Sequence, residues 1–136
     1  MRIMAIDYGD ARTGIAVSDE TATLTGDAWV VQSRNINDVA QIISDEAKSR
    51  SVARIVVGHP KNMDGTTGAR AEKCKQFADL LRSLCKLEVT LWDERMTTMS
   101  ANKILTETGK FGKKRKKTID AVAAALILES YLGSLK

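Results

Sequence analysis

The order of hydrophobic patterns along this chain limits its fold more than any other feature of the sequence. Three short segments, at residues 3–6, 14–18 and 28–33, are mainly apolar and are separated by turn-forming residues. Segments of this length and composition are typical of β-strands, and the short first connection favours a hairpin. The chain is therefore predicted to open with a meander of three strands.

After residue 33 the chain alternates between helical and strand patterns. Asn37 or Asp38 is the expected cap of the first helix, and Thr118 that of the last, which is apolar nearly all round and so predicted to be buried. Strands that alternate with helices form sheets covered on both faces. We therefore predict an α/β protein, one domain spanning residues 1–136, with a mixed sheet of five strands flanked by helices on both faces. The later elements are expected at residues 38–48, 53–58, 69–85, 87–92, 98–108 and 118–132.

The composition indicates a globular chain of 136 residues, 43% of them hydrophobic. The longest apolar run, residues 121–128, is too short to span a membrane, and the N-terminus does not resemble a signal peptide. Cys74 and Cys85 lie eleven residues apart on a predicted helix, about 16 Å along its axis, too far for a disulfide. Reduced thiols and a cytoplasmic location are therefore expected.

Positive charge is concentrated in one segment. Residues 110–117 hold six of the 21 basic residues, and without them 15 basic residues face 17 acidic ones. Such a run is expected to form a mobile loop that binds a phosphate backbone, although a merely solvated charge run is the alternative. The basic residues of the run are Lys110, Lys113, Lys114, Arg115, Lys116 and Lys117.

Three acidic residues stand in unusual places. Asp7 ends the first strand, Glu94 follows the last strand, and Asp120 begins an otherwise apolar helix. Each has a structural explanation by itself: a turn for Asp7, an ion pair with Arg95 for Glu94, and the helix dipole for Asp120. Sites in open α/β sheets form at the carboxyl ends of strands, so the three acids together predict a site for Mg²⁺ or Mn²⁺.

The single histidine, His59, excludes a histidine-rich zinc site, and the chain has no G-x-S-x-G motif of a serine hydrolase. A divalent ion held by carboxylates can activate water for attack on a phosphodiester. A metal-dependent nuclease is therefore one hypothesis that the residues support.

Four segments together resemble the YqgF/RuvX-type family of pre-16S ribosomal RNA nucleases, which are also described as Holliday-junction resolvases. The segments are "IDYGDARTGIAVSD", "IVVGHPKNMDGTTG", "LWDERMTT" and "TIDAVAAALILESYL". The resemblance implies an RNase H-like fold with a five-stranded mixed sheet. It also implies that Asp7, Glu94 and Asp120 are the catalytic, metal-binding set, with Asp93 as the alternative to Glu94.

The resemblance assigns further motif positions and a substrate. The expected substrate is structured nucleic acid, with precursor rRNA favoured and branched DNA possible. The protein is expected to act as a monomer or homodimer and not to associate with a membrane. Arg12, Arg95 and the basic run would contact it, and Tyr8 and Phe111 are the candidates for stacking on bases. The remaining motif positions are Gly9, Gly14, Asn62, Asp64, Gly65, Thr97 and Thr98.

Two other functions remain open. The segment "IDYGDARTG" is also similar to the first phosphate loop of actin and sugar-kinase ATPases, which predicts stabilisation by ATP. A non-catalytic RNA-binding factor would bind RNA without metal-dependent cleavage, and its binding would survive Asp7→Asn.

Overall fold

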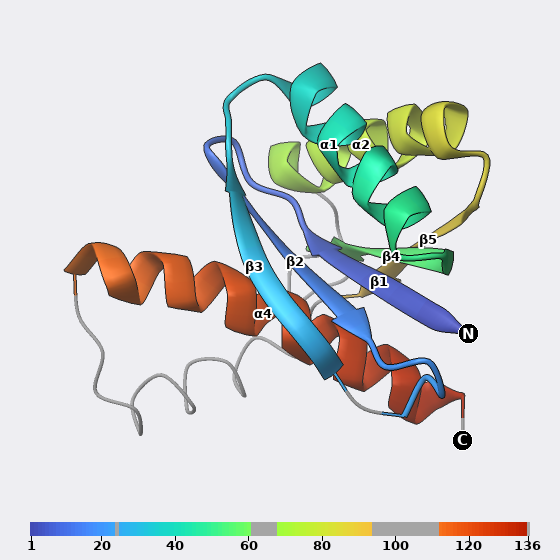
Figure 1. Ribbon diagram of the computed structural model, residues 1–136. Coiled ribbons are helices and arrows are strands. Elements are labelled where there is room, and N and C mark those ends of the chain that lie inside the picture. The colour runs from blue at the N-terminus through green and yellow to red at the C-terminus, as the bar shows by residue number, and fades with distance from the viewer. Residues whose placement is uncertain (24, 61–67, 94–111, 136) are drawn as a thin grey trace.

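The computed structural model describes residues 1–23, 25–60, 68–93 and 112–135, without the side chains of 112–120. One sheet of five strands occupies the centre, with the order β3-β2-β1-β4-β5 (Figure 1). β1 pairs with β2, and β2 with β3, in antiparallel fashion, whereas β4 and β5 run parallel to β1. The predicted five-stranded mixed sheet is confirmed. The strands are β1 (Arg2–Asp7), β2 (Arg12–Ser18), β3 (Thr25–Gln32), β4 (Val52–His59) and β5 (Glu88–Asp93).

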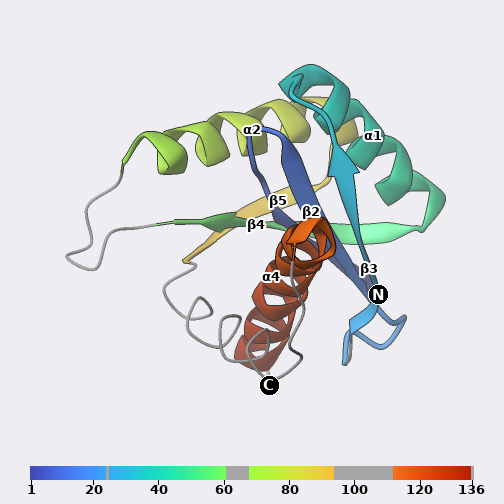
Figure 2. The same cartoon turned by 90° about the vertical axis from the view of Figure 1, so that its left-hand side faces the viewer.

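Helices cover both faces of this sheet, as Figures 1 and 2 show. α1 (Ile36–Ser49) and α2 (Ala69–Cys85) pack on one face, and α4 (Gly112–Ser134) crosses the other, mainly over β2, β1 and β3. The alternation of β1 supplies both faces, since Met4 and Ile6 join the core under α1 and α2, whereas Ile3 and Ala5 join the core under α4. A strand buried on both faces must be continuously apolar, which explains the first segment.

Two details of the first two helices bear on the predictions. The cap of α1 is Asn35, whose side chain accepts hydrogen bonds from the backbone N–H groups of Asn37 and Asp38, so the predicted caps were wrong by two or three residues. The predicted range of α2 is confirmed, and its apolar stripe includes Cys74 and Cys85, both buried and neither in a disulfide.

The final helix differs from its prediction in two ways. α4 begins at Gly112, so residues 113–117 are helical rather than a loop, and Thr118 is not its cap. Lysine and arginine are strong helix formers, and this propensity outweighs the repulsion of like charges. The helix is also buried along one stripe, with Ala124 and Leu128 fully covered, whereas Ala121 and Leu126 are half-buried. The predicted helix at 98–108 lies outside the described residues.

No helix among the described residues is long and apolar enough to cross a membrane.

Candidate active site

Three parallel strands end at one edge of the sheet, and each ends in a polar residue. The last residues of β1, β4 and β5 are Asp7, His59 and Asp93. His59 pairs directly with Asp93, whereas β4 lies between Asp7 and Asp93. Two strand spacings amount to about 9.5 Å. Asp7 and Asp93 therefore lie at the same end of the sheet, on strands that are not neighbours.

Strand alternation separates Asp7 from Asp93. Asp7 continues the alternation of Ile3 and Ala5, which face α4. On β5, Trp92 packs against that core while Leu91 packs against the other, so the alternation places Asp93 on the face of α1 and α2. The Asp7 carboxylate is nevertheless reached by Arg70 of α2, so the alternation does not decide between Asp93 and Glu94, and Glu94 lies outside the described residues.

The connection from β1 to β2 is tight around Asp7. Gly14 pairs with Asp7 across the two strands, so the residue facing this carboxylate has no side chain. The Thr13 hydroxyl lies 3.5 Å from both the N–H and the carbonyl oxygen of Gly9, and a Cβ atom at Gly9 would collide with the carbonyl oxygen of Arg12. Gly9 of the motif thus sits where a side chain would not fit, and Gly14 of the motif lies directly opposite Asp7.

Asp7 is a buried acid with a charged partner. Its side chain is only 10% exposed, and its Oδ1 accepts a hydrogen bond of 3.2 Å from Nη2 of Arg70 in the first turn of α2. One turn further along, Nζ of Lys73 lies 3.1 Å from the carboxylate of the exposed Asp10. Two basic residues of α2 therefore neutralise two acids at the end of β1 and in its turn.

The sequence analysis missed Arg70. The pair joins residues 63 positions apart, and no local pattern connects them. The available signal was the spacing of Arg70 and Lys73 by three residues in the first two turns of a helix, where basic residues oppose the helix dipole. Basic residues at that position call for acidic partners elsewhere.

Tyr8 is not the exposed stacking residue that was predicted. It is 7% exposed, and its ring stacks on Phe77 of α2 with 4.5 Å between centroids. Burial, and next the charge of Asp10, raise the pKa of the Tyr8 hydroxyl above its ordinary value. Tyr8 therefore anchors the end of β1 to α2 and is covered from any nucleic acid.

α4 carries Asp120 and most of the basic run. Figure 1 shows that α4 starts on the side where β1 ends and runs towards the side where both termini lie. Position 120 is four residues before Ala124 and seven before Ile127, both buried against the sheet, and so falls in the same helical stripe. The basic residues of the first two turns are Lys113, Lys114, Arg115, Lys116 and Lys117.

The other predicted positions are placed only in part. Arg12 begins β2, is half-buried, and pairs across the strands with Gln32. Among the described side chains no group of three His, Cys, Asp or Glu converges on one point. Outside the described residues lie Asn62, Asp64, Gly65, Glu94, Arg95, Thr97, Thr98, Lys110 and Phe111.

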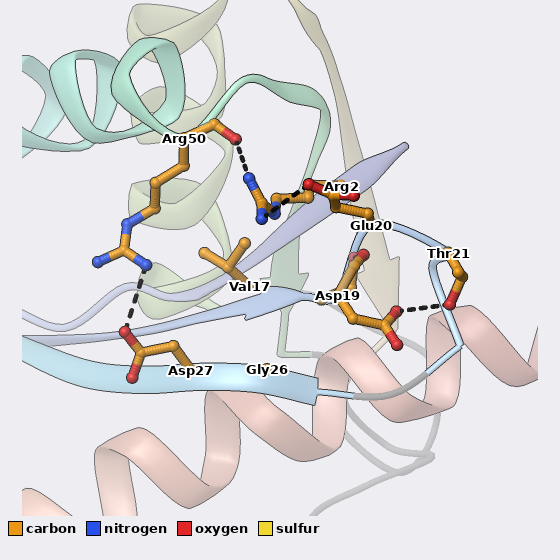
Figure 3. A pocket seen from close by; sticks show the side chains of 9 residues that line it. Arg2, Val17, Asp19, Glu20, Thr21, Gly26, Asp27 and Arg50 are labelled. Atoms are coloured by element: carbon orange, nitrogen blue, oxygen red, sulfur yellow. Dashed lines mark hydrogen bonds and ion pairs between the residues drawn. The ribbon is translucent and has the colours of Figure 1, made fainter.

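A cavity of about 580 Å³ lies at the opposite end of the sheet (Figure 3). It is bordered by the start of β1, the end of β2 and the end of α1. Its two arginines are engaged: Arg2 with Glu20 and the backbone of Arg50, and Arg50 with Asp27, Glu46 and the ring of Trp29. The cavity is thus separate from Asp7, and both of its arginines are already paired with acids. Its lining residues are Arg2, Val17, Ser18, Asp19, Glu20, Thr21, Gly26, Asp27 and Arg50.

Comparison with known proteins connects these features. A family model described as "RuvX: Holliday junction resolvase" matches residues 1–134. The chain belongs to the RuvX family. A relative from Bacillus cytotoxicus is 42% identical and covers 98% of this chain and 99% of its own. One from Acetivibrio thermocellus is 44% identical over 98% and 96%, and both are named "Putative pre-16S rRNA nuclease". The resemblance drawn from the four motifs is confirmed.

Solved structures agree with the fold of this RuvX-family chain. Thermus thermophilus RuvC in complex with a Holliday junction superposes with a TM-score of 0.63 at 12% identity, covering 98% of this chain and 97% of that one. Fowlpox virus resolvase bound to Holliday junction DNA gives 0.61 at 11% identity over 99% of both chains. At these identities the likeness concerns the fold alone, and it confirms the RNase H-like architecture.

Proposed function

We propose that this chain is a metal-dependent nuclease that hydrolyses phosphodiester bonds in precursor 16S rRNA, acting in the cytoplasm as a monomer or homodimer. The observation that carries the proposal is Asp7, a buried carboxylate at the carboxyl end of β1, the central strand of the sheet. The names of relatives at 42–44% identity support precursor 16S rRNA as the substrate.

The donor chemistry of this edge fits a hard divalent cation. Asp7 offers carboxylate oxygens and is already paired with a positive charge, as a buried anion requires. We assign Glu94 and Asp120 as its partners, and all three supply the oxygen ligands that Mg²⁺ and Mn²⁺ prefer. When bound, such an ion supplies a Lewis acid that activates water and stabilises charge on the phosphate.

The chain's own residues prepare this edge for a polyanion. The positive charge of Arg70 offsets the negative charge of the buried Asp7 carboxylate. Gly14 opposite Asp7 and the tight turn at Gly9 keep side-chain bulk away from a phosphate at that point. The basic first turns of α4, on the same side of the sheet, bind the nucleic-acid backbone without reading its sequence.

The test compares the wild type with Asp7→Asn and Asp10→Asn on labelled precursor 16S rRNA, with Mg²⁺, Mn²⁺ or EDTA. Asp10→Asn is a matched control because it removes the same charge three residues away, from a side chain that is 67% exposed and paired with Lys73. We expect Asp7→Asn to lose cleavage by at least about a hundredfold, as for loss of a group that acts in the transition state, and Asp10→Asn to retain it. Equal cleavage by the wild type and Asp7→Asn would show that Asp7 is not part of the active site.

The same assay separates the alternative functions. A four-way DNA junction is included because the family description names Holliday junction resolvase. Preferential cleavage of the junction would make DNA the substrate. If the pure, folded wild type cleaves neither substrate but binds RNA, it is a binding factor, and thermal stabilisation by ATP would support the phosphate-binding alternative.

A further inference from the structure

We propose that Arg70 is an exchangeable counter-ion of Asp7, which the metal displaces and which then binds a phosphate of the substrate. The inference rests on the proposed nuclease function and assigns a positioning residue that the motifs do not contain. It starts from the ion pair between Nη2 of Arg70 and Oδ1 of Asp7, at 3.2 Å.

The two partners differ sharply in burial. The Asp7 side chain is 10% exposed, whereas that of Arg70 is 61% exposed. A carboxylate that has left water must be compensated by a nearby charge or hydrogen bonds, so Asp7 depends on partners such as Arg70. Arg70 remains largely solvated and loses little when it leaves. The pair therefore holds Asp7 in place while the arginine stays free to move.

A divalent ion on Asp7 would compete with this arginine. The guanidinium already occupies hydrogen-bonding distance of one carboxylate oxygen, and a metal ligated by the same carboxylate would lie within a few ångströms of it. Two positive groups at that distance repel each other strongly at a partly solvated site. Binding of the metal is therefore expected to release Arg70.

The released side chain is suited to a phosphate at the same edge. Arg70 lies in the first turn of α2, beside the end of β1 where the reacting phosphate would lie. The planar guanidinium donates two parallel hydrogen bonds to a phosphate, which a lysine cannot do. Lys73, one turn away, is paired with Asp10.

The first measurement is the affinity of the nucleic-acid-free protein for Mn²⁺, by electron paramagnetic resonance, in the wild type, Arg70→Ala, Arg70→Lys and Lys73→Ala. Lys73→Ala removes the same charge from the next turn and controls for general electrostatics. We expect Arg70→Ala to bind Mn²⁺ about tenfold more tightly, as removal of one nearby unit charge implies. Arg70→Lys should stay near the wild type, and Lys73→Ala within about twofold of it.

The outcomes separate the two proposals. If the wild type binds no Mn²⁺, the metal-dependent function fails, and this inference fails with it. If the wild type binds Mn²⁺ but Arg70→Ala binds it equally or more weakly, only the counter-ion role is overturned. An equal gain in Lys73→Ala would also overturn it, because the effect would then be one of net charge.

The second measurement is binding of a fluorescent precursor 16S rRNA fragment with Ca²⁺, a non-catalytic substitute for Mg²⁺, or with EDTA. We expect Arg70→Ala to weaken binding about fivefold with Ca²⁺ and to leave it unchanged in EDTA, where the arginine is engaged by Asp7. Arg70→Lys should restore only part of the loss with Ca²⁺. An equal loss in both media would make Arg70 an ordinary surface contact and overturn the exchange.

Discussion

At the scale of single residues, the end of β1 is built to hold one carboxylate. Asp7 is buried, faces a glycine across the strands and is paired with an arginine from another layer. The ring of the next residue, Tyr8, stacks on Phe77 and so packs the end of the strand against α2. Side chains around Asp7 are therefore set by the protein's packing, and changes in the adjoining turn should be felt at the site.

Gly9→Ala tests that packing. The added Cβ would collide with a backbone oxygen, that of Arg12, so the turn must shift. We expect the free energy of unfolding, measured in urea, to fall by about 1–3 kcal/mol, as for overpacked positions. Gly133→Ala is the control, because nothing lies within 4 Å of its Cβ and alanine favours a helix. A Gly9→Ala protein as stable as Gly133→Ala would contradict the tight turn.

Tyr8 predicts a dependence of stability on alkaline pH. Its pKa is raised in the folded protein, mainly by burial and next by Asp10, so the folded state holds the proton more firmly than the unfolded chain does. The stabilisation is complete below the ordinary pKa of 10.0 and is lost as pH rises through the folded value. Free energies of unfolding measured from about pH 9 to 11 should therefore fall more steeply for the wild type than for Tyr8→Phe. Parallel curves would show that Tyr8 ionises equally in both states.

At the scale of elements, hydrophobic periodicity predicted α2, whose position is set by burial. It did not predict the start of α4, which is set by helix propensity. The stripe of α2 is strict, and its bounds were predicted correctly. The start of α4 was not, because a run of lysines reads as a charged loop although each residue favours a helix. Asn35 was missed as the cap of α1, since Asn35, Asn37 and Asp38 can all cap a helix and only the backbone geometry selects one of them.

Leu128→Ala measures how much α4 contributes. Leu128 is fully buried between α4 and the sheet, and its truncation leaves a cavity, so we expect a loss of about 2–5 kcal/mol in urea unfolding. Leu126→Ala, on the half-buried side of the same helix, should cost clearly less. Similar losses in the two variants would mean that α4 is buried all round, as the sequence first indicated.

At the scale of the whole molecule, charge is divided between two regions. The chain carries a net charge of +4, yet six of its basic residues lie within eight positions, mostly on the first turns of α4. The cavity at the other end of the sheet instead pairs each arginine with an acid. The basic end, which we propose binds the nucleic acid, and the end with the cavity therefore lie at opposite ends of the sheet.

The role of the basic start of α4 is tested by replacing five residues with glutamine: Lys113, Lys114, Arg115, Lys116 and Lys117. Glutamine keeps the helix propensity while removing the charge. Each phosphate contact that is lost reduces the slope of log affinity against log salt by about 0.7–0.9, so we expect a slope smaller by up to about 4 for labelled precursor rRNA. Lys48→Gln, exposed at the end of α1, should leave the slope unchanged. An unchanged slope in the five-residue variant would remove α4 from the interface.

The sequence predicted the sheet and the position of Asp7 because both follow from local patterns: an apolar run that ends in an acid, then glycines. It did not predict Arg70 or the engagement of Tyr8, because these depend on α2 packing beside the end of β1, with partners 63 and 69 positions apart. Long-range pairs of this kind leave no spacing to detect in one sequence. Asp7 was therefore predictable from the sequence, whereas the groups that surround it were not.

The placement of α4 has a consequence for the order of folding. Among the described residues, the core under α1 and α2 is formed by positions 4–91, whereas the second core needs α4 to close against strands roughly a hundred positions earlier. Contacts that close such long loops form late. We therefore expect the first layer to assemble before α4 docks. The site proposed above takes Asp120 from α4, so it would be completed only in this last step, and an incompletely folded chain would be inactive.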